Sequence, residues 1–321
     1  MTGHVIDPHA HVVLEDAFGC AGTFGPDLSD VDGVPEFRVG RYTMRPAPYR
    51  GSVFMDADER ERAMARHGID RQMLSPNPLT FFGGIDVVAA AEFAAATNTA
   101  MSELVGGRPH LLGAAQVPLQ DVAAACRETE RAAELGLSAV YAGTDYGLAW
   151  DDRALAPFFD TLVACDLPLF IHAATNDGDG PTPDRLRRHG LDLVAGYTAE
   201  ETIVAATFVL GGVLDRHAAL DVCLSHGGGA VALLTERFDS MLGFRGKPAG
   251  FAQELSRLWF DAHVGAGRAR ELLVDTVGTE RLVYGTNFGG WDTPDHADDF
   301  AASLTPNAER LLRLTPGGSN R

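Results

Sequence analysis

The stretch Val5-Ile6-Asp7-Pro8-His9-Ala10-His11 is a short β-rich run that closes on two histidines. Residues i and i+2 of a strand point to the same side, so the imidazoles of His9 and His11 face one point. Further along the chain, three more β-rich runs end in or are closely followed by a histidine: His172, His226 and His263. Neutral imidazole is the commonest metal ligand. The five histidines therefore predict a metal site where these strands end.

The runs that carry the histidines belong to a longer series in which short β-rich segments alternate with helical patterns. This alternation is typical of βαβ units and a parallel sheet. The predicted strands are Val5–His9, Gln72–Ser75, Leu111–Gln116, Ala139–Ala142, Pro168–His172, Asp221–Ser225, Leu258–Ala262 and Leu282–Gly285. Eight strands are the count of a (β/α)8 TIM barrel, an α/β fold whose sites lie at the carboxyl ends of the strands. We expect residues 1–321 to form one such domain.

Residues 14–55 do not fit this rhythm, because they are rich in Gly, Pro and Phe and follow the first strand. A structureless stretch of this length is usually functional, and we expect an insertion that forms a lid over the mouth of the barrel. The stretch carries four arginines on an otherwise acidic chain: Arg38, Arg41, Arg45 and Arg50. They predict a seat for an anionic part of a substrate, such as phosphates. A solvated loop with scattered arginines is the alternative.

The overall charge excludes some classes of partner. There are 26 basic and 44 acidic residues, a formal net charge of −18, which argues against nucleic acids and anionic membrane surfaces as partners. No run of 18 apolar residues and no signal-peptide pattern is visible, so we expect no membrane span and a cytoplasmic location. The two closest of the four cysteines, Cys126 and Cys165, are 39 residues apart, which fits reduced thiols.

Five stretches, taken in their order along the chain, carry a resemblance to a known family. They are Asp7–His11, Phe170–His172, Gly211–Arg216, Leu224–Gly229 and Leu282–Thr286. With these spacings the chain resembles the amidohydrolase superfamily, in the branch of the aminocarboxymuconate-semialdehyde decarboxylase-like enzymes. The resemblance implies a TIM barrel with a metal at its carboxyl-terminal mouth.

One position departs from that family. The motif after the eighth strand reads Gly-Ser/Thr-Asp in the family, whereas this chain has Asn287 in place of the aspartate. An amide cannot accept a proton at neutral pH, although its oxygen can still ligate a metal. Asp292 follows five residues later, and we expect it to lie off the strand as a poor substitute.

Other donors exceed what one metal ion needs. His263 is spaced i+2 from Asp261, and Glu201 matches the glutamate of the family's Glu-Thr pattern, although capping of its helix is an equal alternative. Asp261 and Asp7 could ligate or orient an imidazole. Because one zinc ion needs about four ligands, the surplus suggests two metal ions. The expected ligands are His9, His11, His172, Glu201, His226, His263 and Asn287, with Asn287, Asp261 and Glu201 as catalytic candidates.

These features favour a narrower resemblance, to the TIM-barrel non-heme diiron monooxygenases of platensimycin and platencin biosynthesis. It implies two iron ions that use O2 to hydroxylate an unactivated C–H bond of a diterpenoid-like substrate in antibiotic biosynthesis. A CoA thioester could then meet the four arginines, and an unidentified electron donor would be needed. Phe81, Phe82 and Trp291 could line the pocket for the hydrocarbon body, although aromatic residues are more often core.

Two alternatives stay open. One is a metal-dependent decarboxylase or hydrolase of the amidohydrolase superfamily with a single zinc or manganese ion. The other is a catalytically silent protein that binds a metal or ligand. The substrate is a small molecule in each enzymatic hypothesis, and a homo-oligomer is possible in all of them.

Overall fold

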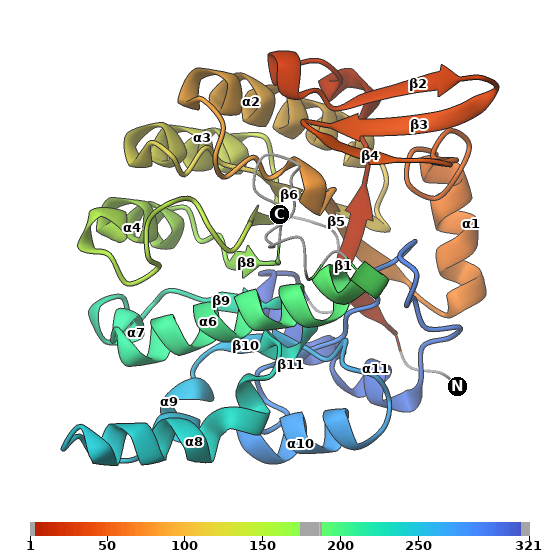
Figure 1. Ribbon diagram of the computed structural model, residues 1–321. Coiled ribbons are helices and arrows are strands. Elements are labelled where there is room, and N and C mark those ends of the chain that lie inside the picture. Colours follow the sequence, from red (N-terminus) through yellow and green to blue (C-terminus); the bar gives the residue numbers. More distant parts are fainter. Residues whose placement is uncertain (1–3, 174–185, 187, 316–321) are drawn as a thin grey trace.

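A computed structural model describes residues 4–173, 186 and 188–315 of the chain. Eight parallel strands form one sheet in the order of the sequence, with helices around it (Figure 1). The strands are β1 (Ile6–Val12), β5 (Arg71–Pro76), β6 (Leu111–Ala115), β7 (Ala139–Ala142), β8 (Leu169–Ile171), β9 (Val222–Leu224), β10 (Trp259–Asp261) and β11 (Leu282–Val283). This architecture confirms the predicted (β/α)8 barrel.

The helices lie between the strands and cover the outside of the barrel (Figure 1). They are α1 (Ala57–His67), α2 (Val87–Val105), α3 (Val122–Glu134), α4 (Ala156–Ala164), α6 (Tyr197–Leu210), α7 (Val213–Arg216), α8 (Val231–Phe244), α9 (Phe251–Leu255), α10 (Arg268–Val277), α11 (Asp299–Ser303) and α12 (Thr305–Leu311). Several begin at an aspartate whose carboxylate accepts a hydrogen bond from a free backbone N–H of the first turn, as Asp56 does at α1 and Asp121 at α3. Such caps stabilise a helix start by about 1 kcal/mol each.

Alternation along each strand decides which side chains reach the interior of the barrel. In β8, Leu169 and Ile171 pack outward against the helices, whereas Phe170 joins the interior cluster with residues such as Trp259 of β10. His172 is two residues beyond Phe170 and therefore points inward as well. The same period turns Asp261 inward, two residues after Trp259. The inward directions of His172 and Asp261 thus follow from the pleat.

The barrel is joined only weakly between its first and last strands. The regular part of β11 has two residues, and one isolated bridge, between Ala10 and Phe288, links it to β1. A side chain completes the junction, because the buried Asp7 carboxylate accepts hydrogen bonds from the backbone N–H and the hydroxyl of Thr286 at 3.2 and 2.6 Å. Gln72 of β5 donates to the same carboxylate at 2.7 Å.

Residues 14–55 contain regular structure, so the prediction of a structureless stretch was wrong. Three antiparallel strands, β2 (Asp27–Val31), β3 (Val34–Val39) and β4 (Tyr42–Met44), form a second sheet, which lies beside α1 and α2 in Figure 1. Phe37 and Val39 face a core of their own and are fully buried. Short helical turns complete the chain, namely η1 (Glu15–Ala17), η2 (Gly22–Phe24), η3 (Pro78–Thr80), η4 (Arg153–Leu155), η6 (Arg188–Gly190), η7 (Asp192–Gly196) and η8 (Ser225–Gly228).

One helical stretch, Arg188–Leu210, is long and apolar enough to be a candidate membrane span, so the expected absence of such a stretch is not confirmed. In this fold its larger part, α6, packs against α8, α9 and the turn after β9. The buried residues of α6 include Val204, Ala205 and Phe208. Length and composition are thus the only features that speak for a span.

Candidate metal centre

The imidazoles of four histidines converge at the carboxyl ends of β1, β8 and β9. The ring centroids of His9 and His11 are 5.1 Å apart, and that of His172 lies 5.0 Å from His9 and 4.8 Å from His11. His226 completes the group at 4.9 Å from His172. His226 itself stands at φ +48°, in the left-handed region, where the tight turn after β9 directs its ring inward. We call these four residues the histidine cluster.

Each ring of the histidine cluster is held through its Nδ1 atom. The Nδ1 partners are Asp261 Oδ2 for His9 (2.7 Å), Ser75 Oγ for His11 (2.8 Å), the Ala173 carbonyl for His172 (2.5 Å) and Glu201 Oε1 for His226 (2.8 Å). The Ser75 hydroxyl donates its hydrogen bond to the Ala10 carbonyl, so the imidazole of His11 is the donor in its contact with Ser75. With Nδ1 as donor, Nε2 of each ring carries the lone pair whenever that ring is neutral. This is the arrangement that metal-bound histidines adopt.

The inward-facing nitrogens lack suitable partners within the described part of the chain. His9 Nε2 and His11 Nε2 face each other at 3.3 Å, and two lone pairs at that distance need a cation or a proton between them. His172 Nε2 is buried and has no hydrogen-bond partner. One coordinating atom from each of His9, His172 and His226 lies within 4.8 Å of the others. The donor set therefore fits a divalent cation.

Burial and charge set the protonation of the cluster. Burial, together with the neighbouring imidazoles, lowers the pKa values of His9, His11 and His172 well below the ordinary value, so these rings are neutral. Burial also acts to lower the pKa of His226. The carboxylates of Glu201, Asp261 and Asp292 outweigh it and raise that pKa to about 9. A metal ion that binds His226 must displace this proton.

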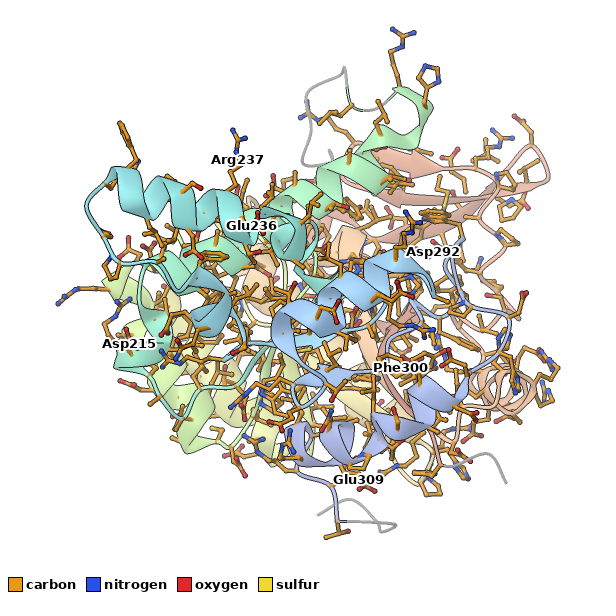
Figure 2. The ribbon with its side chains drawn as sticks, turned by 90° about the horizontal axis from the view of Figure 1, so that it is seen from below. Asp215, Glu236, Arg237, Asp292, Phe300 and Glu309 are labelled. Carbon is orange, nitrogen blue, oxygen red and sulfur yellow. The ribbon has the colours of Figure 1, made fainter. Side chains whose placement is uncertain are left out.

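We expect zinc binding at neutral pH to release about one proton per ion, because His226 is then protonated until the ion takes Nε2. Isothermal titration calorimetry in two buffers of different ionisation enthalpy measures this number. Glu201→Gln removes the nearest charge and should reduce the release. Glu236→Gln, on the exposed side of α8 (Figure 2), should leave it unchanged. Zinc binding without proton release in the unaltered protein would show that His226 is not protonated before the ion binds.

Glu201 reaches the cluster from α6 and is fully buried. Its Oε1 accepts hydrogen bonds from His226 Nδ1 and from the Ala173 backbone N–H, whereas its Oε2 is buried and has no partner among the residues that the structure describes. Burial raises the pKa of this carboxyl. The side chain thus orients His226 and leaves one oxygen available beside the cluster.

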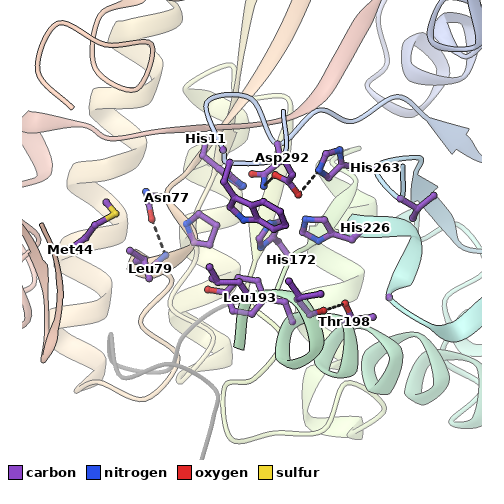
Figure 3. A pocket seen from close by; sticks show the side chains of 18 of the residues that line it. His11, Met44, Asn77, Leu79, His172, Leu193, Thr198, His226, His263 and Asp292 are labelled. Carbon is purple, nitrogen blue, oxygen red and sulfur yellow. Dashed lines mark hydrogen bonds and ion pairs between the residues drawn. The ribbon is translucent and has the colours of Figure 1, made fainter. Parts of the chain in front are cut away.

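His263, Asn287 and Asp292 form a second hydrogen-bonded group beside the histidine cluster, where the ring centroid of His263 lies 5.5 Å from that of His226 and 5.8 Å from that of His9. His263 Nε2 lies 2.9 Å from Asp292 Oδ2, and Asn287 Nδ2 donates to Asp292 Oδ1 at 2.8 Å. Asp292 lies beyond β11, as expected, yet its side chain lines the same cavity as His226, together with those of His263 and Asn287. Figure 3 shows Asp292 and His263 side by side above His226. The surplus of donors in the sequence is thus accounted for in part by hydrogen bonds among them.

A cavity of about 460 Å³ opens over the histidine cluster, a size suited to a small organic ligand. Apolar residues of the lining come from both sides, with Tyr42, Met44 and Tyr49 from the insertion and Leu193 and Val194 before α6. Met44 lies opposite His226 and His263 in Figure 3. Trp291 lines the mouth and is 71% exposed.

The other residues predicted to bind the substrate do not line this cavity. Phe81 and Phe82 are buried in the core, against Tyr141 and Phe93 respectively. Arg38 bonds to Asp27, Arg45 to the Val31 carbonyl and Arg50 to Glu15, and Arg41 occupies the turn between β3 and β4. Within the described residues, none of the four arginines lines the cavity over the cluster.

Two contributors to the site were missed in the sequence. Ser75 lies in β5, one residue before its end, and its hydroxyl holds His11. A polar residue at the end of a predicted strand was the available signal. Asp292 was set aside because of its distance along the chain from the strand, although the turn that begins at Asn287 brings it back to the cavity.

Comparison with known proteins places these residues in a family context. A family model described as amidohydrolase matches residues 6–314. The 2-amino-3-carboxymuconate-6-semialdehyde decarboxylase of Dictyostelium discoideum is 27% identical over 73% of this chain and 66% of its own length. A gamma-resorcylate decarboxylase of a Polaromonas species is 28% identical over 76% of this chain and 79% of its own.

Solved structures share the fold. The IDCase of Metarhizium anisopliae in its apo form has a TM-score of 0.79 and 22% identity, and 98% of each chain is covered. A dihydroxybenzoic acid decarboxylase of Polaromonas, solved with bound manganese and the inhibitor 2-nitroresorcinol, has a TM-score of 0.71 and 22% identity, with 97% of each chain covered.

These relatives overturn the main functional prediction. The curated relatives named above are decarboxylases, so the prediction of a diiron monooxygenase, an oxidoreductase of diterpenoid and antibiotic biosynthesis, was wrong. The predicted iron pair, CoA thioester and electron donor find no support in them. The second metal ion was predicted because the donors in the sequence outnumber those that one ion needs. Two of those donors, His263 and Asn287, form hydrogen bonds with Asp292.

Proposed function

We propose, since this chain belongs to the amidohydrolase family, that it is a metal-dependent decarboxylase acting on a small carboxylic acid. The observation that carries the proposal is the histidine cluster, four imidazoles held by Nδ1 with Nε2 inward at the base of a cavity. The relatives named above supply the reaction class, since both remove a carboxyl group as CO2.

In this proposal His9, His11, His172 and His226 hold one divalent ion, with the free Oε2 of Glu201 as a further donor. Imidazole with a carboxylate suits manganese or zinc. When bound, such an ion supplies a Lewis acid that holds and polarises oxygen atoms of the acid. Asp261, Ser75 and Glu201 fix the rings through Nδ1, so the site is ordered before the acid arrives.

The walls of the cavity orient the substrate and exclude water. Tyr42, Met44 and Tyr49 present apolar surface opposite the histidine cluster, which suits a planar unsaturated or aromatic acid whose carboxylate points to the cluster. We propose that residues 14–55, from which these side chains come, act as the lid of a single domain comprising residues 1–321.

The decisive experiment is reconstitution of the metal-free protein with Mn²⁺, Zn²⁺ or Fe²⁺, followed by metal counting and a CO2 assay. The test acids are gamma-resorcylate, 5-carboxyvanillate and 2-amino-3-carboxymuconate 6-semialdehyde. We expect about one ion per chain, because the coordinating atoms of His9, His172 and His226 lie within 4.8 Å of one another, and CO2 release from at least one acid. No CO2 from any acid with any of the three metals would overturn the proposal and favour a catalytically silent protein.

A further inference from the structure

The turn after β11 returns a carboxylate to a place where the strand itself carries an amide. Asn287 stands at φ +50°, a left-handed conformation that asparagine tolerates better than most residues. The turn is compact, because Gly290 N–H donates to the Asn287 carbonyl at 2.7 Å and the Thr293 hydroxyl donates to the same oxygen at 3.1 Å. A Cβ on Gly290 would lie 2.7 Å from that oxygen. The turn thereby fixes Asp292 over the cavity.

Asp292 is fully engaged in this position. Its Oδ1 accepts from Asn287 Nδ2 and its Oδ2 from His263 Nε2. The amide at Asn287 is thus a donor that orients the carboxylate, a task that an ionised aspartate at the same position could not perform. Hydrogen bonds from His263 and Asn287 hold the pKa of Asp292 below its usual value despite partial burial, so the side chain is an anion at neutral pH.

Hydrogen bonds of the backbone and of the ring both hold His263 in place. Its backbone N–H donates to Asp261 Oδ1 at 3.0 Å, and its ring binds Asp292 through Nε2. The side chains of His263 and Asp292 are 8% and 25% exposed, and both line the cavity. With Nε2 bound to the carboxylate, Nδ1 is the nitrogen that remains for proton exchange. An imidazole backed by a carboxylate is the usual device for moving a proton in an active site.

Resting on the proposed function, we propose that His263 and Asp292 form a proton-transfer pair in which His263 gives a proton to the carbon that loses CO2. The bond between that carbon and the carboxylate breaks, its electron pair stays on the carbon, and CO2 leaves. The carbon takes the proton from His263 Nδ1, and His263 recovers one from water. Asp292 is a positioning residue that holds Nε2 of His263, and Asn287 holds Asp292.

The kinetic test uses the metal-loaded enzyme and whichever acid the unaltered protein decarboxylates. Asp292→Asn should lower kcat about 100-fold, the lower range for loss of acid–base catalysis, with KM and metal content within about twofold. His263→Gln should have a similar effect. The kcat of the double variant should be no lower than that of the less active single variant, because the two residues act as a unit. The matched control is Asp275→Asn, an exposed aspartate of α10, which should leave kcat unchanged.

A second readout needs no turnover. In the zinc-loaded protein with 15N-labelled histidine, the N–H between His263 and Asp292 should give a downfield proton signal that both single variants lose and Asp275→Asn keeps. If the unaltered protein lacks this signal, or if Asp292→Asn retains its kcat, the inference is overturned while the proposed function stands. If the unaltered protein releases no CO2, the proposed function fails and the inference falls with it.

Discussion

Replacement of His172 by alanine should weaken zinc or manganese binding by more than 100-fold and abolish CO2 release. Loss of a partner that only orients a ligand typically costs 10- to 100-fold in metal affinity, and loss of the ligand itself should cost more. His172 is the histidine that β8 contributes, and its buried Nε2 has no partner within the described residues. Equilibrium dialysis with metal counting measures the affinity.

The control for this variant is His110→Ala. His110 is exposed and lies just before β6, at the amino-terminal end of that strand, where its ring contacts the Asp70 carbonyl. The control protein should keep the metal affinity and turnover of the unaltered chain. Full metal content in the His172→Ala protein would show that the ion lies elsewhere.

Gly229→Ala should produce the largest loss of stability among single-methyl additions near the site, about 4 kcal/mol. Gly229 adopts φ +69°, and a Cβ would lie 2.1 Å from the Thr198 carbonyl and 2.7 Å from Thr202 Oγ1. Left-handed backbone strain and overpacking each cost about 1–3 kcal/mol. The Thr202 hydroxyl also receives the Ala230 N–H, so a shift there disturbs the turn that orients His226. Urea unfolding measures the change in free energy.

Gly243→Ala is the matched control. Gly243 lies in α8, and a Cβ there meets nothing within 4 Å. Alanine is favoured over glycine in a helix by up to about 1 kcal/mol, so this variant should be as stable as the unaltered protein or slightly more stable. Equal stability of the Gly229→Ala protein would show that the turn after β9 can relax, contrary to our expectation.

Much of the fold could be predicted because period-two burial and helical patterns are local properties of the chain. The eight expected strands all overlap observed ones, and the pleat alone places His9, His11 and His172 on one side. The sheet of residues 27–44 was missed although it had a local signal. Asp32-Gly33 joins β2 to β3, and both residues adopt positive φ, which is the usual hairpin turn for Asp-Gly.

The chemistry was harder to predict because a sequence supplies donors without their partners. His263 and Asn287 count as possible metal ligands until hydrogen bonds to Asp292 are seen. Asp292 itself was undervalued because separation along the chain says little about a tight turn. The inference of two metal ions followed from that count, and it led to the wrong class of reaction.

The weak junction between the first and last strands has a consequence for how this protein can change in evolution. Among the described residues, one bridge and the Asp7–Thr286 contacts tie the last strand to the first. The turn from Asn287 to Asp292 begins just beyond them. Exchanges that keep the hydrogen bonds of that turn, such as those at the exposed Trp291, can therefore accumulate at little cost to the scaffold. New reactivity can arise there while the other strands retain their architecture.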